Sequence, residues 1–343
     1  MRALKVLFRL DATSAIGTGH LMRCLTLAQA FITQAKRSSV NISCGFYTQA
    51  LPQALAEQLK LHGFEHLLAD RIDADIMPIL NWQTDLLIVD HYGLDANWER
   101  QLYDQLPILV LDDLADRSHC ANWLLDQGPL RQAKDYQPQI NVQCQLLLGC
   151  QYTLINPVFR QIRHASAFAF RRGFICFGGA DPVHATLTTL HSLSQIKLAQ
   201  HIDWQVVAGA ANPDWQTLQS VAQHSTLRLH LHRHEPNIPA QLANADFAIG
   251  AAGGMTWERC CVGIPTLCVP IVDNQSFNAH VIKEQRLGEL LSLTQLNEPA
   301  TLEATLCRLR DDASGYLKRS QSLIDGLGAS RLAHYLVNQL IDT

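Results

Sequence analysis

A histidine beside two glycines is the first place along the sequence where residue types and spacing suggest chemistry. The segment IGTGH at residues 16–20 follows an apolar run that ends in RLD at residues 9–11, and it precedes residues with helical apolar spacing. Gly17 and Gly19 let the backbone approach a ligand closely, and a helix start offers N–H groups to an anion. His20 could act there as a general base, because imidazole titrates near neutral pH. On its own, the segment favours the plainer interpretation, in which His20 caps a helix and the glycines make a turn.

The spacing of these glycines excludes two common nucleotide-binding motifs. A dinucleotide fingerprint needs GxGxxG, and a P-loop needs a GK[ST] ending, and the segment has neither. A ligand held here would therefore depend on a different arrangement of backbone groups.

A second glycine pair, Gly178 and Gly179, lies in the segment FGGADP at the end of an expected strand. The segment is typical of a tight turn into a helix that begins near His184. We expect Asp181 to cap that helix and Pro182 to occupy its first turn. This structural role is compatible with contact between the loop and a ligand.

A third loop combines glycines with polar residues at a helix start. The segment IGAAGGMTWE at residues 249–258 indicates a buried strand, a turn and a helix. The backbone N–H groups of Gly254, Met255 and Thr256 could hold a pyrophosphate without a lysine. Glu258 lies about one turn into the helix, where its carboxylate suits ribose hydroxyls or serves as a partner of the helix dipole.

Short apolar strands alternate with helical patterns along the chain, which is typical of parallel α/β domains. We expect two Rossmann-like, doubly wound domains, residues 1–160 and 161–343, with the last helix packing back on the first domain. In such sheets ligands bind beyond the carboxyl ends of the strands. The three loops then describe a nucleotide that is held by the second domain and faces a reactive group of the first across a cleft. The expected strands are residues 5–10, 42–46, 86–90, 108–111, 146–148, 173–177, 204–208, 227–231, 247–250 and 266–269.

Composition narrows the class of protein. The chain has 343 residues, 48% of them hydrophobic and 17% charged, with a net charge of −4, so no basic field invites nucleic acid or a membrane surface. The N-terminus lacks the pattern of a signal peptide, and no apolar stretch reaches the length of a membrane span. Ten cysteines show no CxxC pair, which favours reduced thiols in the cytoplasm. We expect no metal and a monomer.

Three other groups of polar residues could carry chemistry, and each has a plainer interpretation. His91 competes with His20 as a base, but its place directly after a strand favours a structural role. The alternation HLHRH at residues 230–234 would put three imidazoles on one strand face, although a solvated edge is the preferred interpretation. The pair Asp112 and Asp113 could bind a cation, and hydrogen bonding to loop backbone is favoured instead.

The order of the motifs along nearly the whole chain resembles that of the hydrolases of pseudaminic acid biosynthesis. The segments that carry the resemblance are RLDATSAIGTGHLMRCLTLA, DHYGLD, LDDLADRSH, LLDQ, LLGCQYTLINPVF, FGGADP, GAAGGMTWERCCVGIPTL and DNQ. The resemblance implies the glycosyltransferase-B architecture. It also implies that water displaces UDP, with inversion, from UDP-2,4-diacetamido-2,4,6-trideoxy-β-L-altropyranose, without a metal or cofactor.

The resemblance further implies roles for single residues. His20 would be the catalytic base, Asp11 would orient it, and Tyr92 would line the sugar pocket. Asn274 would touch the sugar or a phosphate. The residues expected to contact the substrate are Arg9, Gly17, Gly19, Gly178, Gly179, Asp181, Gly253, Gly254, Met255, Thr256, Glu258, Asn274 and Gln275.

Two rival functions remain open at this point. A glycosyltransferase would pass the sugar to an acceptor instead of water, and it would want a basic, apolar docking face that the helix at residues 21–33 lacks. A non-catalytic binding protein for nucleotide sugars would not need His20 in the loop. A hydrolase accounts for more of these residues than either rival.

Overall fold

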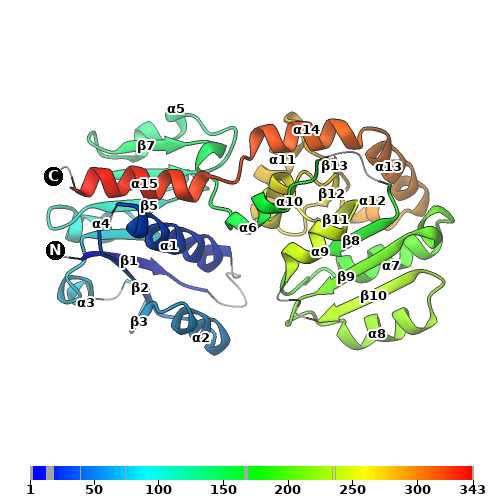
Figure 1. The fold of residues 1–343 in the computed structure, drawn as a ribbon, viewed down its shortest axis with the longest axis horizontal. Coiled ribbons are helices and arrows are strands. Elements are labelled where there is room, and N and C mark those ends of the chain that lie inside the picture. Colours follow the sequence, from blue (N-terminus) through cyan, green and yellow to red (C-terminus); the bar gives the residue numbers. More distant parts are fainter. Residues whose placement is uncertain are drawn as a thin grey trace. The chain divides into compact units, whose positions relative to one another are not determined.

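The chain forms two compact α/β units, each built around a parallel sheet. The computed structural model describes residues 3–12, 19–38, 40–73, 75–165, 169–233, 235 and 237–341. Unit 1 comprises Met1–Asn156 and Gly326–Thr343, and unit 2 comprises Pro157–Asp325 (Figure 1). The division between the units thus falls a few residues before the expected boundary at 160, and the last helix belongs to unit 1.

Unit 1 contains a seven-stranded parallel sheet in the order β3-β2-β1-β4-β5-β6-β7 among the described residues. The strands are β1 (Leu4–Leu10), β2 (Ile42–Thr48), β3 (Glu65–Leu68), β4 (Leu86–Asp90), β5 (Ile108–Leu111), β6 (Trp123–Asp126) and β7 (Gln145–Leu148). The helices are α1 (Gly19–Ser38), α2 (Gln53–Leu61), α3 (Met77–Asn81), α4 (Ala96–Tyr103), α5 (Ala133–Tyr136) and α15 (Gly328–Ile341), with 3₁₀ turns η1 (Gln137–Gln139) and η2 (Cys150–Tyr152).

Unit 2 contains a six-stranded parallel sheet in the order β10-β9-β8-β11-β12-β13 over its described residues. The strands are β8 (Arg172–Cys176), β9 (Asp203–Ala208), β10 (Arg228–Arg233), β11 (Phe247–Ala251), β12 (Thr266–Val269) and β13 (Glu289–Leu290). The helices are α6 (Pro157–Gln161), α7 (Ala185–Ser194), α8 (Trp215–His224), α9 (Ile238–Asn244), α10 (Met255–Val262), α11 (Ser276–Glu284), α12 (Leu293–Leu296), α13 (Pro299–Asp311) and α14 (Ala313–Leu323), with 3₁₀ turns η3 (Leu198–His201) and η4 (Asp273–Gln275).

The parallel sheets confirm the expected fold class, and the strands that sequence analysis missed are short ones. β3 lies at the edge of its sheet and is only half-buried, and β13 has two residues. β6 is fully buried, but it offers only three apolar residues in a row before Asp126, without alternation. Short buried strands of this kind give little periodic signal.

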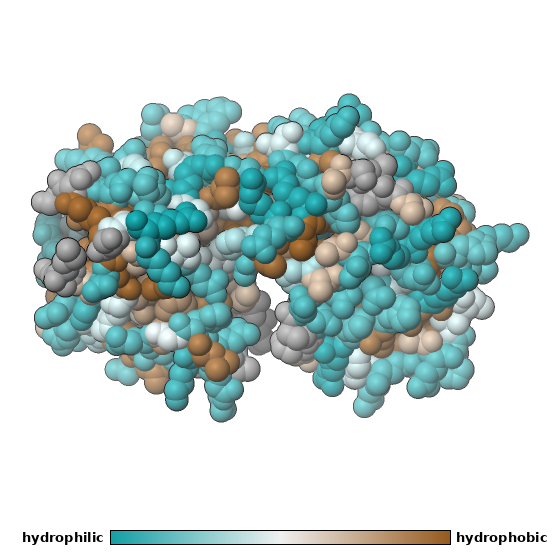
Figure 2. Space-filling model, viewed as in Figure 1, coloured by the Kyte–Doolittle hydropathy of each residue, from teal (hydrophilic) through white to brown (hydrophobic). Residues whose placement is uncertain are grey.

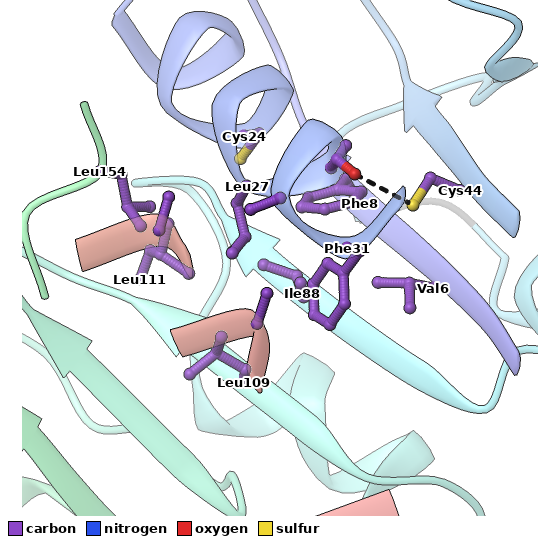
Figure 3. Close-up of a cluster of buried hydrophobic side chains, with 14 of the residues drawn as sticks. Val6, Phe8, Cys24, Leu27, Phe31, Cys44, Ile88, Leu109, Leu111 and Leu154 are labelled. Carbon is purple, nitrogen blue, oxygen red and sulfur yellow. Dashed lines mark hydrogen bonds between the residues drawn. The ribbon is translucent and has the colours of Figure 1, made fainter. Parts of the chain in front are cut away.

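Unit 1 has a buried hydrophobic cluster on each face of its sheet, and α1 and α15 cover one of them. α15 packs against α1, and both contribute apolar side chains to one cluster (Figure 1). Figure 3 shows Leu27 and Phe31 of α1 gathered with Phe8 and Ile88 of the sheet. The Cys44 thiol donates to the Ala28 carbonyl at 3.8 Å in the same layer. The C-terminal helix is therefore part of the core that supports α1.

The core of unit 2 depends on close packing around aromatic rings. Phe170 stacks on Phe247 with ring centroids 3.9 Å apart, and Trp204 meets Phe247 edge-on at 5.3 Å. A side chain at Gly173 would come within 2.4 Å of the Trp204 ring, so the glycine makes room for the indole. This cluster fixes the positions of β8, β9 and β11.

Each sheet reverses its strand order at one point, and that point predicts where a ligand binds. In unit 1 the order changes between β1 and β4, and in unit 2 it changes between β8 and β11. The loops that leave the carboxyl ends of β4, β8 and β11 contain Tyr92, Gly178 and Gly254, and the chain after β1 leads to His20 in the first turn of α1. Three of these loops are the ones that sequence analysis singled out, and the fourth follows β4.

No helix within the described residues is long and apolar enough to span a bilayer. On the face shown in Figure 2, hydrophilic residues predominate and apolar ones are scattered among them. Scattered apolar residues are ordinary on protein surfaces.

We predict that Leu336→Ala lowers the free energy of unfolding by about 2–4 kcal/mol, because it opens a cavity between α15 and α1. Leu336 is fully buried in the core cluster of unit 1. Asn338→Ala, on the exposed side of the same helix, is the matched control and changes stability little. Urea denaturation of both variants is the measurement. Identical curves for the two would contradict a structural role for α15.

Candidate active site

A buried histidine and a buried carboxylate meet where β4 ends and α1 begins. His20 lies in the first turn of α1 and is 6% exposed, and Asp90 is the last residue of β4 and is 1% exposed. The Nδ1 atom of His20 lies 2.5 Å from Oδ1 of Asp90. β1 pairs with β4 and α1 follows β1 along the chain, so the sheet order brings together residues 70 positions apart.

Arg23 supports the same carboxylate from the next turn of α1. Its Nε donates to Oδ2 of Asp90 at 2.6 Å, and its Nη2 lies 2.5 Å from Oδ1. Burial alone would raise the pKa of Asp90, but the Arg23 guanidinium and His20 hold that pKa well below its usual range. Asp90 is therefore an ionised acceptor at neutral pH.

The ionised carboxylate decides which nitrogen of neutral His20 carries the proton. Because Asp90 can only accept, Nδ1 must donate, and Nε2 is left with a lone pair. The contact of Arg23 Nη2 with His20 Nδ1, at 3.2 Å, then joins two donors and is not a hydrogen bond. No described residue hydrogen-bonds Nε2, so this atom is available to take a proton from water.

Tyr92 and Asp113 complete the surroundings of the histidine. The ring of Tyr92 meets the His20 ring edge-on, with centroids 4.6 Å apart. The Tyr92 hydroxyl donates to Oδ1 of Asp113 at 3.0 Å, and Arg23 Nη1 donates to Oδ2 at 2.9 Å. Burial and the nearby Asp113 raise the pKa of Tyr92, so its hydroxyl stays protonated. Tyr92 is 39% exposed and can meet a ligand beside His20.

The structure corrects the expected role of Asp11. Its Oδ2 pairs with Nε2 of His91 at 2.9 Å, and its Oδ1 accepts from the backbone N–H groups of Gln49 and Ala50. Burial opposes ionisation, but His91 and a neighbouring arginine lower the pKa of Asp11 to about 2. Asp11 therefore holds the loop after β2 and orients His91, whereas Asp90 orients His20.

His91 is a structural residue in this arrangement. The Gly93 N–H donates to its Nδ1 at 2.9 Å while its Nε2 faces Asp11. Both ring nitrogens are thus occupied within the chain, in agreement with the structural interpretation of His91.

Arg9 cannot contact a substrate as expected, because it is completely buried. Side chains alternate along β1, and Arg9 points to the sheet face opposite that of Phe8. Its guanidinium donates to the carbonyl of Ile72 at 2.7 Å and to Asp11 at 3.1 Å, and it lies over the ring of Tyr47. Arg9 therefore ties the loops after β1 and β3 to the end of strand β2.

Sequence analysis missed the residues that surround His20, although weak signals were present. Arg23 stands three residues after His20, which places both on one face of a helix. Asp112 and Asp113 have different roles. Asp112 accepts from the N–H groups of Leu114 and Ala115, in agreement with the expected bonding to loop backbone. Asp113 instead accepts from Arg23 beside His20.

Gly17 lies outside the described residues, and Gly19 opens α1 with no atom within 4 Å of a Cβ placed there. Among the described side chains, no three His, Cys, Asp or Glu residues converge as metal ligands would. His234 also lies outside the described residues, and His230 and His232 stand on the edge strand β10.

In unit 2 the loop after β8 presents glycines to open space. Gly178 has a φ of +96°, which favours glycine, and a Cβ at Gly178 or Gly179 would meet no atom within 4 Å. Asp181 is 1% exposed, and its two oxygens accept from the N–H groups of Ala185 and Thr186 at 2.8 Å. The Asp181 side chain therefore accepts from the first amides of α7 as a cap would, although His184 stands at the N-cap position.

The expected place of Pro182 is also corrected, because α7 begins at Ala185 and the proline lies in the turn before it. His184 adopts a left-handed backbone conformation with φ of 58° between these two residues. The turn thus needs two further residues before the helix starts.

The loop after β11 leads directly into α10. Gly254 meets no atom within 4 Å of a Cβ placed on it and has a helical φ of −56°, so neither packing nor conformation requires a glycine there. A ligand that approaches the backbone closely would require a glycine at this position. Met255 is the first residue of α10. The N–H of Thr256 donates back to the carbonyl of Gly253 at 3.0 Å. Sequence analysis expected this amide to bind a phosphate, but it already has an acceptor within the chain.

Glu258 is a carboxylate without a hydrogen-bond donor among the described residues. Burial raises its pKa to about 7, against the opposing effect of Arg259. A partly exposed, unpartnered carboxylate at the start of α10 is suited to accept hydrogen bonds from hydroxyl groups.

Of the polar amide side chains after β12, some hydrogen-bond the backbone and one is exposed to solvent. Gln275 is 9% exposed and its Oε1 accepts from the Ile271 N–H at 3.0 Å, while Asn274 is exposed. Asn278, which sequence analysis missed, donates to the carbonyl of Ala252 at 2.9 Å and braces the glycine loop.

The chain matches known proteins in both sequence and structure. Residues 177–332 match the model of the glycosyltransferase family 28 C-terminal domain. The chain is 29% identical to UDP-2,4-diacetamido-2,4,6-trideoxy-beta-L-altropyranose hydrolase from Campylobacter jejuni subsp. jejuni serotype O:2, covering 80% of this chain and 95% of that protein. It is 23% identical to the spore coat polysaccharide biosynthesis protein SpsG of Bacillus subtilis (strain 168), covering 93% and 94%.

Solved structures add the fold. Spinosyn rhamnosyltransferase SpnG aligns with a TM-score of 0.65 at 15% identity, covering 99% of this chain and 100% of that one. The two parallel α/β units are those of the glycosyltransferase-B fold. In sequence the chain is similar, over four fifths of its length, to the curated altropyranose hydrolase, and its C-terminal part matches the glycosyltransferase family 28 domain.

Proposed function

We propose that the protein hydrolyses UDP-2,4-diacetamido-2,4,6-trideoxy-β-L-altropyranose to UDP and the free sugar, as a step of pseudaminic acid biosynthesis. The observation that carries the proposal is the buried pair of His20 and Asp90, which leaves Nε2 of the histidine as a base. The similarity to the curated hydrolase supports the choice of substrate.

The proposed reaction is a single displacement at the anomeric carbon. His20 Nε2 takes a proton from water while the water oxygen forms a bond to that carbon. The bond from the carbon to the UDP oxygen breaks, and UDP leaves with the electron pair, so the configuration inverts. UDP is a stable anion, so the leaving group needs no general acid, in contrast to an ordinary glycoside. One base near neutrality is then sufficient.

Unit 2 would hold the nucleotide. The open backbone at Gly178, Gly179 and Gly254 leaves room for a diphosphate, and the N-terminus of α10 favours negative charge. Glu258 would accept hydrogen bonds from the ribose hydroxyls, which would supply the donors that its carboxylate lacks. Exposed Asn274 would contact the sugar or a phosphate.

The proposal includes a reaction without metal, a monomeric protein and a cytoplasmic location. The ten cysteines are all free thiols, which supports a reducing compartment. Activity that is lost with EDTA and restored with magnesium would contradict the metal-free reaction. The alternative of a non-catalytic binding protein leaves the orientation of His20 by Asp90 without a purpose.

We predict that His20→Asn lowers turnover by about 10²–10⁴-fold and leaves the affinity for UDP unchanged, because the variant loses only the base. UDP release and calorimetric UDP binding are the two measurements. His62→Asn, an exposed histidine of the same unit, is the matched control and retains full turnover. Turnover of His20→Asn within about tenfold of the wild type would exclude His20 as the base.

Glu258→Gln is predicted to stabilise the protein at pH 8 by roughly 1–3 kcal/mol, because it removes a carboxylate that folding disfavours. The folded pKa of about 7 lies above the ordinary value of 4.5. Rising pH ionises the group in the unfolded chain first, so the wild type loses stability from about pH 4.5 to 7, and the difference between the proteins vanishes near pH 4.

Denaturation at pH 4 and pH 8 measures this difference, and UDP binding measures the second consequence, a weaker affinity in the variant. Glu284→Gln changes an exposed glutamate of α11 and is the control for both. A variant that binds UDP as tightly as the wild type would remove Glu258 from the proposed ribose site.

A further inference from the structure

A buried arginine without a counter-ion lies in α10, just behind the glycine loop. Arg259 is 1% exposed. Its Nη2 donates to the carbonyl of Ala251 at 2.6 Å and to Oγ1 of Thr256 at 3.1 Å. Its Nε and Nη1 are buried, and the described residues offer them no acceptor. Three of the five N–H bonds of the guanidinium are therefore unused.

The guanidinium lies at the carboxyl ends of the central strands. A Cβ at Gly250 would come within 2.3 Å of both Arg259 Nη1 and the carbonyl oxygen of Cys176, so this glycine makes the space that the guanidinium occupies. Gly250 on β11 pairs with Cys176 on β8, and β8 ends there. The charge thus sits where the strand order of unit 2 reverses, close to where the two glycine loops begin.

No described carboxylate forms an ion pair with Arg259, whose Nε and Nη1 find no acceptor in the described part of the chain. The adjacent Glu258 is close enough for Arg259 to lower its pKa, but burial raises that pKa to about 7, so Glu258 offsets the positive charge only in part. The thiols of Cys176 and Cys268 lie nearby, but burial raises the pKa of each, so both stay neutral. An uncompensated buried cation is unfavourable, and an anion bound beside it would offset that cost.

We infer that Arg259 is a positioning residue for the diphosphate of the substrate, supplying positive charge from beneath the glycine loops without touching the ligand. The inference rests on the proposed function. Arg259 acts in two ways: its field attracts the phosphates, and its bonds to Ala251 and Thr256 hold the turn that starts α10. The partial positive charge at the N-terminus of α10 and the positive charge of Arg259 then both attract the diphosphate.

The test compares ligands that differ only in phosphate. Arg259→Met is predicted to weaken UDP binding about tenfold and uridine binding less than about twofold, since only the charged ligand feels the guanidinium. Arg259→Lys keeps the charge and loses the fork, so it retains the preference for UDP over uridine. Arg172→Met, at the opposite end of β8 where Arg172 pairs with Asp246, is the matched control and leaves both affinities unchanged.

Calorimetric titration of each variant with UDP and with uridine gives the result, and the ligand-free melting temperature gives a second reading. The loss of an uncompensated charge and the loss of the bonds to Ala251 and Thr256 act in opposite directions on that temperature, so a cooperative melt serves to show that Arg259→Met is folded. An equal loss of UDP and uridine affinity would make Arg259 merely structural and overturn the inference. If the wild type binds UDP and Arg259→Met binds it equally well, the inference about Arg259 is overturned while the proposed function stands. A wild type that does not bind UDP would overturn the proposed function as well.

Discussion

The arrangement in unit 1 depends on one interaction, the ionised carboxylate of Asp90 buried between His20 and Arg23. A carboxylate in such a place is stable only if cationic or donor groups surround it. Arg23 supplies the charge, and His20 uses the remaining oxygen. The same contact fixes the histidine tautomer and leaves Nε2 with a lone pair. Without the arginine, the buried carboxylate would be poorly tolerated, and without the carboxylate the imidazole would have no fixed orientation.

The two units share a strand topology but differ in how their buried charged groups are paired. In each, the strand order reverses beside the first strand, and the loops there carry the polar groups. In unit 1, acids and bases satisfy one another almost completely around His20. In unit 2 a buried cation, Arg259, has no counter-ion, and a carboxylate, Glu258, has no donor. This contrast fits the proposal of a base in unit 1 and an anion-binding site in unit 2.

Much of the fold could be predicted from the sequence, because alternating short strands and helices leave a periodic signal that does not depend on tertiary contacts. The glycine loops and His20 could be found for the same reason, since local spacing reveals them. The partners of these residues could not. Asp11 and Asp90 both stand at the ends of buried strands, and only the pairing of β1 with β4 shows which of them reaches His20. Arg9 is equally instructive: a charge at a strand end suggests a ligand, yet its alternation with Phe8 turns it into the opposite layer.

The central claim is that water, activated at His20, attacks the anomeric carbon of a UDP-sugar. The most direct measurement is hydrolysis of UDP-2,4-diacetamido-2,4,6-trideoxy-β-L-altropyranose in water enriched in oxygen-18, without any acceptor. We predict release of UDP with one labelled oxygen in the free sugar and none in UDP. Label in UDP would place the attack at phosphorus and contradict the account. Tight binding of UDP without release of sugar would also contradict it, and would identify the protein as a transferase or as an enzyme for another UDP-sugar.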